Sequence, residues 1–122
     1  MKRIALIALV AVAALAVTVT ALGATVINNP TAAVRLAYAK KALVAKAGSV
    51  TLRSKNTSAV LKHNIALRKG TTATGRLLVK GQVVGRNGVS KFTKTLAKGK
   101  YRFVCTVPGH EAGGMWGILT VK

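Results

Sequence analysis

Acidic side chains are almost missing from this sequence, which has 20 Lys and Arg residues but a single carboxylate side chain, that of Glu111. The formal net charge is +19, and the cations are spread along the chain rather than gathered in one block. A field of this size speeds encounters with anionic surfaces and partners by long-range steering. A simpler interpretation is that the charge only maintains solubility.

Aromatic residues are also scarce, at 4% of the chain, and no fold typical of nucleic-acid-binding proteins is recognisable. Basic charge without such a fold does not predict a nucleic-acid partner. We therefore expect the positive charge to meet an acidic protein, an anionic membrane or an acidic cell-envelope polymer.

Cysteine occurs once, as Cys105, which excludes an internal disulfide. Because this residue lies near the C-terminus, no cysteine is available near the N-terminus for lipid attachment. A lone cysteine is usually a buried small hydrophobe. In an exported chain, however, a single thiol needs another explanation, and metal ligation provides one.

Long apolar runs are absent after the first two dozen residues, as are internal repeats and low-complexity tracts. Lys2 and Arg3 precede the uncharged residues 4–22, a pattern typical of an export signal that is also long enough to span a bilayer. We expect residues 1–24 to be a signal peptide or a membrane anchor, helical if retained, and we favour cleavage. The protein would then be periplasmic, extracellular or tethered to the outer face of the cytoplasmic membrane.

The rest of the chain suffices for one modest core. We expect a linker at residues 25–33 and one domain at residues 34–122. Short apolar segments separated by turn residues predict strands rather than helices. They lie at residues 34–38, 50–52, 61–68, 77–79, 82–84, 89–92, 101–105 and 118–121. Such spacing is typical of an all-β, Greek-key antiparallel β-sandwich.

Alternation along two of these segments places candidate ligands on inward faces. His63 shares a face with Leu61, Ile65 and Leu67, so its ring should point inward among aliphatic side chains. The same count places Cys105 on one face with Tyr101 and Phe103, at the end of a core strand.

The most informative motif is Cys105-x4-His110-x4-Met115. Thiolate, imidazole and thioether are soft ligands that favour copper over hard cations, and a Cys, two His and a long axial Met are typical of electron-transfer copper. The second histidine has to be His63, because the chain has no other. Pro108 and the glycines before His110 and Met115 supply the turns that bring a short loop back on one point.

This region resembles the C-terminal strand and ligand loop of the cupredoxins, the family of plastocyanin, azurin, auracyanin and rusticyanin. The resemblance rests on residues 101–110 and 115–117, read with His63 and Asn64. Loop length is most similar to the auracyanin and rusticyanin type. The resemblance implies one type 1 copper ion, with four ligands: His63, Cys105, His110 and Met115.

The same resemblance implies roles for the neighbours of the ligands. Asn64 would bridge the two ligand segments and shield the thiolate. The edge of His110 would reach the surface within an apolar patch that serves as the electron port, for which the candidates are Val107, Pro108 and Trp116. Core packing is an equal alternative for Trp116. Glu111 follows a ligand directly, so its carboxylate would favour Cu(II), unless it is simply a solvated loop side chain.

We therefore expect an exported, monomeric blue copper protein that carries single electrons between redox partners, and not an enzyme, since four ligands leave no position for a substrate. Acidic redox proteins would be its partners. Two alternatives stay open: a copper storage or delivery module with the same ligands, and a metal-free cationic sandwich that binds envelope polymers.

Overall fold

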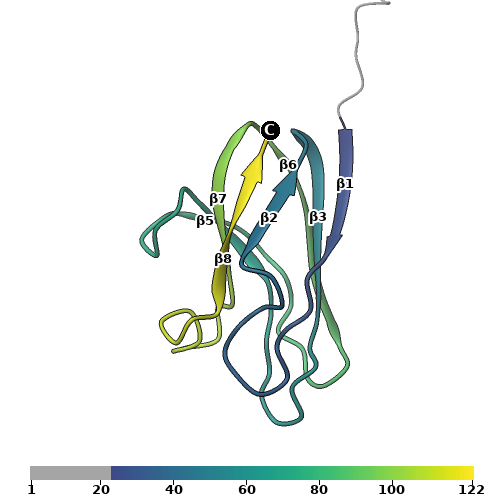
Figure 1. Cartoon of the computed structure of the whole chain (residues 1–122), viewed down its shortest axis with the longest axis vertical. Helices are drawn as coiled ribbons and strands as arrows, with labels where there is room; N and C mark the ends of the chain where they lie inside the picture. The colour runs from purple at the N-terminus through teal and green to yellow at the C-terminus, as the bar shows by residue number, and fades with distance from the viewer. Residues whose placement is uncertain (1–22) are drawn as a thin grey trace, which may run out of the picture.

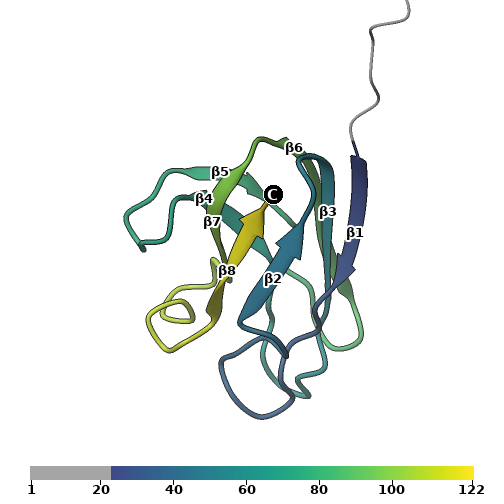
Figure 2. The ribbon, with the colours of Figure 1, turned by 45° about the horizontal axis from the view of Figure 1, so that its top comes forward.

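The computed structural model describes residues 23–122, which form a two-layer β-sandwich (Figures 1 and 2). One sheet has the strand order β1–β3–β6 and the other β2–β8–β7–β4–β5. The strands are β1 Gly23–Asn28, β2 Ala42–Ala45, β3 Gly48–Lys55, β4 Ala66–Lys69, β5 Leu77–Lys80, β6 Val89–Leu96, β7 Gly99–Val104 and β8 Trp116–Val121. The expected all-β, two-sheet sandwich is confirmed. The expected helical leader lies outside the described residues, except for residues 23 and 24, which belong to β1.

The expectation of antiparallel pairing throughout is wrong at two places. β1 pairs in parallel with β3, and β2 pairs in parallel with β8. The chain passes from β1 to β2 in the other sheet and then back to β3, so two neighbouring strands of one sheet run the same way. Parallel pairs need such a crossover, whereas a hairpin gives antiparallel ones.

The expected linker at residues 25–33 is also wrong. Residues 25–28 lie in β1, and Asn29 and Thr31 are buried. The Asn29 side chain exchanges two 2.9 Å hydrogen bonds with the backbone of Lys40, and the backbone N–H of Thr57 donates to Thr31 Oγ1 at 3.0 Å. These polar side chains form hydrogen bonds with backbone groups of nearby loops. Their polarity therefore does not indicate a solvent-exposed linker.

Three segments predicted as strands are largely irregular: residues 34–38, the first half of residues 61–68, and residues 82–84. Residues 34–38 form a loop, fixed by one bridge between Thr31 and Tyr38, and Val34 is 95% exposed. Around His63, regular pairing begins only at β4, and a single bridge joins His63 to Val84. His63 is buried as predicted, but Leu61 is 42% exposed, because the alternation of a regular strand does not extend to it.

Apolar side chains from both sheets fill the space between the layers. The buried cluster consists of Tyr38, Leu43, Ala45, Val50, Leu52, Ile65, Leu67, Phe92, Leu96, Tyr101, Phe103, Cys105, Met115, Leu119 and Val121. Two predicted ligands, Cys105 and Met115, belong to this cluster, so the core itself forms the floor of the candidate site. Within residues 23–122, no helix is long and apolar enough to cross a membrane.

The ligand loop and the start of β1 lie at opposite ends of the sandwich, as Figure 1 shows. Gly23 pairs with Gly48, and Gly99 pairs with Val121, at one end. Val104 pairs with Trp116 at the other end, where the chain enters and leaves the loop.

Candidate metal centre

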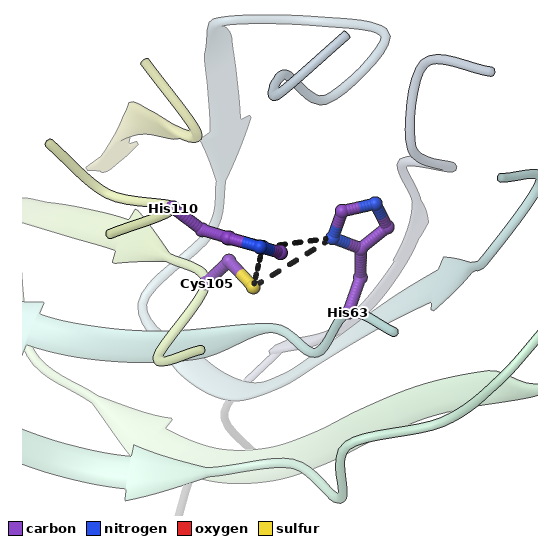
Figure 3. Close-up of side chains that lie close together, drawn as sticks. All are labelled: His63, Cys105 and His110. Carbon is purple, nitrogen blue, oxygen red and sulfur yellow. Dashed lines mark hydrogen bonds between the residues drawn. The ribbon is translucent and has the colours of Figure 1, made fainter. Parts of the chain in front are cut away.

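Three predicted ligands converge on one point (Figure 3). His63 Nδ1 lies 3.2 Å from His110 Nδ1, and Cys105 Sγ lies 3.9 Å and 3.5 Å from these two nitrogens. A point equidistant from three atoms so spaced lies about 2.1 Å from each, within the range of metal–imidazole bonds and slightly short of metal–thiolate bonds. The three donors therefore fit a single metal ion in a trigonal arrangement.

Backbone hydrogen bonds fix the chain at each of these ligand residues. Cys105 follows β7 directly, and its N–H donates to Met115 O at 3.1 Å, which closes the loop. The N–H of Met115 donates in turn to His110 O at 3.0 Å. His63 exchanges two backbone hydrogen bonds with Val84, of 3.1 Å and 2.9 Å. The ligands are thus held by the surrounding chain before any metal binds.

Two glycines in the loop have backbone angles that other residues rarely adopt. Gly109 has a φ of +82° and Gly114 a φ of +117°. Only glycine takes up such angles without strain, so the turns before His110 and Met115 depend on these residues. Met115 is fully buried in the same core cluster as Cys105, and its thioether would supply the fourth ligand to a metal held there.

The protonation states suit a copper site. Burial lowers the pKa of His63, and the nearby His110 ring lowers it further. Burial also lowers the pKa of His110. Burial raises the pKa of the Cys105 thiol, although hydrogen bonds from the backbone of Asn64 and Val107 oppose this rise. At neutral pH both imidazoles therefore offer lone pairs, and the thiol gives up its proton when a metal binds.

Asn64 connects the two ligand segments, as the resemblance implied. Its Nδ2 donates to Thr106 Oγ1 at 2.9 Å, and its Oδ1 accepts from Thr106 N–H at 2.7 Å. Its carbonyl oxygen accepts from the Tyr38 hydroxyl at 2.6 Å. The fully buried Asn64, which follows His63, is thus bonded to Thr106, which follows Cys105.

Glu111 is not a solvated loop side chain. It forms ion pairs with Arg68 at 2.8 Å and with Arg102 at 2.7 Å, and its side chain is 16% exposed. Burial raises the pKa of Glu111, but the hydrogen bonds and positive charges of the two arginines outweigh that effect and hold the pKa below its ordinary value. Sequence reasoning found Glu111 but missed both arginines, because Arg68 lies 43 positions away on β4, and Arg102, on the neighbouring β7, meets Glu111 only through the path of the loop.

The surroundings of His110 differ in part from the expected electron port. Pro108 is exposed, and Val107 and His110 are half-buried. Trp116 is half-buried beneath two cations, with Lys41 Nζ 3.8 Å and Arg102 Cζ 4.0 Å from the ring centroid. Its ring is therefore covered by charge.

Two apolar residues that precede the other histidine ligand in the chain are at the surface, which sequence analysis did not expect: Val60 was not considered, and Leu61 was placed on the inward face. Val60 is 87% exposed and Leu61 42% exposed, in the segment that leads into His63. The sequence signal that could have found them is the pair of adjacent apolar residues, Val60 and Leu61, which breaks the alternation of polar and apolar residues two positions before His63.

Comparison with known proteins supports the geometric assignment. Residues 25–122 match the family model described as copper binding proteins of the plastocyanin/azurin family. The chain belongs to this family. Its type 1 copper site consists of His63, Cys105, His110 and Met115.

Similar members of the family include auracyanin-A of Chloroflexus aurantiacus, 31% identical over 99 residues that cover 62% of this chain and 61% of that protein. Rusticyanin of Acidithiobacillus ferrooxidans is 47% identical over 38 residues, or 31% of this chain and 24% of that protein. The chain thus matches less than two thirds of the length of each of these two relatives. The reduced auracyanin of Roseiflexus castenholzii has a similar structure, with a TM-score of 0.72 and 30% identity over 83% of this chain and 98% of that one.

Proposed function

We propose that this protein carries single electrons between redox partners, with one copper ion that alternates between Cu(II) and Cu(I). The convergence of His63 Nδ1, His110 Nδ1 and Cys105 Sγ carries the proposal. Imidazole suits copper, and thiolate and thioether donors select Cu(I), so this donor set binds both oxidation states. An electron carrier is not an enzyme, and family membership supports that assignment.

The chain's own residues contribute rigidity. Electron transfer is fast when the ligands move little between the two oxidation states. The hydrogen bonds between Cys105 and Met115, between Met115 and His110, and between Asn64 and Thr106 all resist such movement. Burial of Cys105 and His63 keeps water from the thiolate side of the site.

Electrons would enter and leave at the half-exposed edge of His110. Exposed Pro108, half-buried Val107 and the exposed pair Val60 and Leu61 supply apolar contact area around the two histidine ligands. Lys62, next to His63, is exposed and favours an acidic redox protein as partner. Trp116, beneath its two cations, would join this surface as a charged rim rather than an apolar centre.

We place the protein outside the cytoplasmic membrane, as a monomer that is released or tethered to the outer face. The pattern of residues 1–22 supports export. β1 begins at the end of the sandwich opposite the ligand loop, so a retained anchor would leave the copper end accessible to partners (Figure 1). The +19 charge would also favour contact with anionic lipid or envelope polymers.

Titration of the purified metal-free protein with Cu(II), followed by visible spectroscopy and voltammetry, tests the function. An intense thiolate-to-copper charge-transfer band with reversible voltammetry supports the carrier. A weak band with slow redox cycling would instead indicate copper storage or delivery, and no binding would leave only a cationic envelope-binding sandwich. Cys105→Ser is the matched control, because a hydroxyl cannot supply the soft thiolate that the strong band needs.

A further inference from the structure

The outer face of the five-stranded sheet has two arginines directly opposite each other. Arg68 on β4 is the cross-strand partner of Arg102 on β7. Like charges in this arrangement destabilise a sheet. The two side chains are nevertheless largely buried, at 23% and 10% exposure, so the position requires a negative charge between them.

Glu111, the one acidic residue of the chain, supplies that charge. Arg68 donates to both carboxylate oxygens, from Nε at 3.2 Å and 3.3 Å and from Nη2 at 2.8 Å. Arg102 Nε donates to Oε2 at 2.7 Å. Charge-assisted hydrogen bonds are stronger than neutral ones, and several on one carboxylate fix its direction. The three residues form what we call the Arg68–Glu111–Arg102 triad.

Both arginines have further partners that fix them in turn. Arg68 Nη1 donates to Gly75 O at 3.0 Å, and Arg102 Nη1 donates to Thr71 O at 3.3 Å, so each is tied to the turn between β4 and β5. The Arg102 guanidinium also covers the ring of Trp116, the residue after Met115. Arg102 therefore contacts the loop at Glu111 and again where the loop rejoins the sheet.

The position of Glu111 in the loop gives the triad its significance. The loop contains Gly109, Gly113 and Gly114, and glycines give a backbone high conformational freedom. Cys105 is fixed by the end of β7, but His110 lies in the middle of this glycine-containing loop, one residue before Glu111. Glu111 is also tied into the loop through its backbone, since the Gly114 N–H donates to the Glu111 carbonyl oxygen at 3.0 Å.

We propose that Glu111 is a positioning residue, which the Arg68–Glu111–Arg102 triad holds against the sheet so that His110 is in place for copper. Within residues 23–122 no hydrogen bond joins a side chain of the triad to a ligand side chain, so the triad acts through the backbone. This inference deepens the proposed function, because it identifies what keeps one ligand still during electron exchange. It differs from the view of Glu111 as a nearby negative charge that tunes the metal by its field alone.

Glu111→Asp separates these two views, since it keeps the charge and shortens the side chain by one methylene. The readouts are Cu(II) affinity, the charge-transfer spectrum, and amide hydrogen exchange at Gly113, Gly114 and Met115 in the metal-free protein. Loss of positioning should weaken Cu(II) binding about tenfold, the lower end for residues that orient ligands. It should also change the spectrum and speed exchange of these amides. Affinity and exchange equal to those of the parent would overturn the proposal.

Glu111→Gln and Arg102→Gln extend the test, because the two views predict different directions of change in their Cu(II) affinity. A field effect requires opposite changes, with Cu(II) binding weakened by the first variant and strengthened by the second. Positioning requires that both weaken binding, and that the double variant loses less than the sum, because the two residues act as a unit. Thr95→Lys is the control, because it changes an exposed side chain of β6 and raises the net charge by one, as Glu111→Gln does. It should leave the hydrogen exchange of the loop amides unchanged.

Hydrogen exchange is measured without copper, so the outcome is independent of the electron-transfer function. Faster loop exchange in a protein that binds no copper would support positioning and contradict the proposed function. A drop in melting temperature with unchanged affinity, spectrum and loop exchange would overturn positioning, because it would show that the triad only stabilises the sheet.

Discussion

At the scale of single residues, the ligands differ in donor atom and in burial. His63 and His110 present the same ring nitrogen, Nδ1, to the thiol sulfur, while the Nε2 of His63 is buried with no hydrogen-bond partner in residues 23–122. Met115, like Cys105, is fully buried in the core. Since the axial ligand tunes the redox potential of such sites, Met115 is the residue through which the potential can be changed with least effect on the fold.

Met115→Leu should keep the intense colour and raise the reduction potential, because the thiolate bond stays and the axial donor is lost. The backbone hydrogen bonds of residue 115 should survive a swap of similar volume, which costs under about 1.5 kcal/mol. Voltammetry and the visible spectrum give the result. Leu119→Met, the reverse exchange in the same core, should leave the potential unchanged. Identical potentials for Met115→Leu and the parent would mean that Met115 is not a ligand.

The stability of the metal-free protein should vary with pH through the ligands themselves. The folded-state pKa of His63 and His110 is depressed from 6.5, so the stability they contribute is complete above that pH and lost as pH falls. The folded-state pKa of Cys105 is raised from 9.0, so its contribution is complete below that pH and lost as pH rises. We therefore expect a maximum between these values.

Thermal unfolding of the copper-free protein, measured from about pH 5 to about pH 9.5, checks this expectation. Cys105→Ser removes the thiol and should flatten the alkaline limb while leaving the acidic limb in place. Melting temperatures that stay level from neutral to weakly acidic pH would contradict the histidine contribution.

At the scale of elements, β7 and β8 frame the metal loop and pack closely where they face each other. Gly117 on β8 pairs with Phe103 on β7. A Cβ at position 117 would lie 2.6 Å from Phe103 Cε2 and 2.6 Å from Lys41 O. This contact fixes the β8 end of the loop, two residues from the Met115 ligand.

Gly117→Ala should destabilise the fold by about 1–3 kcal/mol, because neither the buried Phe103 ring nor the Lys41 backbone can move away freely. Gly85→Ala is the matched control, since nothing lies within 4 Å of a Cβ there and the φ of Gly85 is not positive. That control should be neutral or slightly stabilising. Chemical denaturation of both variants measures the difference, and equal free energies of unfolding would show that β8 can shift to accept a methyl group.

At the scale of the whole molecule, the imbalance of charge dominates. The single acidic side chain already serves Arg68 and Arg102, so the other cations of the chain have no acidic side chain left to pair with. A surface of this kind favours anionic partners and makes their association sensitive to salt.

Electron exchange with an acidic redox protein should slow steeply as ionic strength rises, because the Debye length falls from about 30 Å at 0.01 M to about 10 Å at 0.1 M. Stopped-flow rates over that range provide the measurement. An uncharged small-molecule reductant serves as control, and its rate should not change. A flat rate with the acidic protein would remove electrostatic steering from the description of this carrier.

The sequence by itself determined the metal chemistry and the class of fold. Donor type depends on residue identity, and Cys105, His110 and Met115 lie in one short loop whose glycine turns are local properties. The inward direction of His63 followed from its aliphatic neighbours, and short spaced strands implied a sandwich. All of these signals act over a few residues, and a single sequence displays them directly.

Only the tertiary structure decided which distant residues meet. His63 and His110 are 47 positions apart, and Arg68 and Glu111 are 43 apart. Cross-strand register places Arg68 opposite Arg102, and loop packing places Lys41 over Trp116. Register, and the parallel pairing of β1 with β3 and of β2 with β8, arise from how the two sheets stack as a whole. No local pattern encodes these contacts, so the surroundings of the ligands became visible only in the fold.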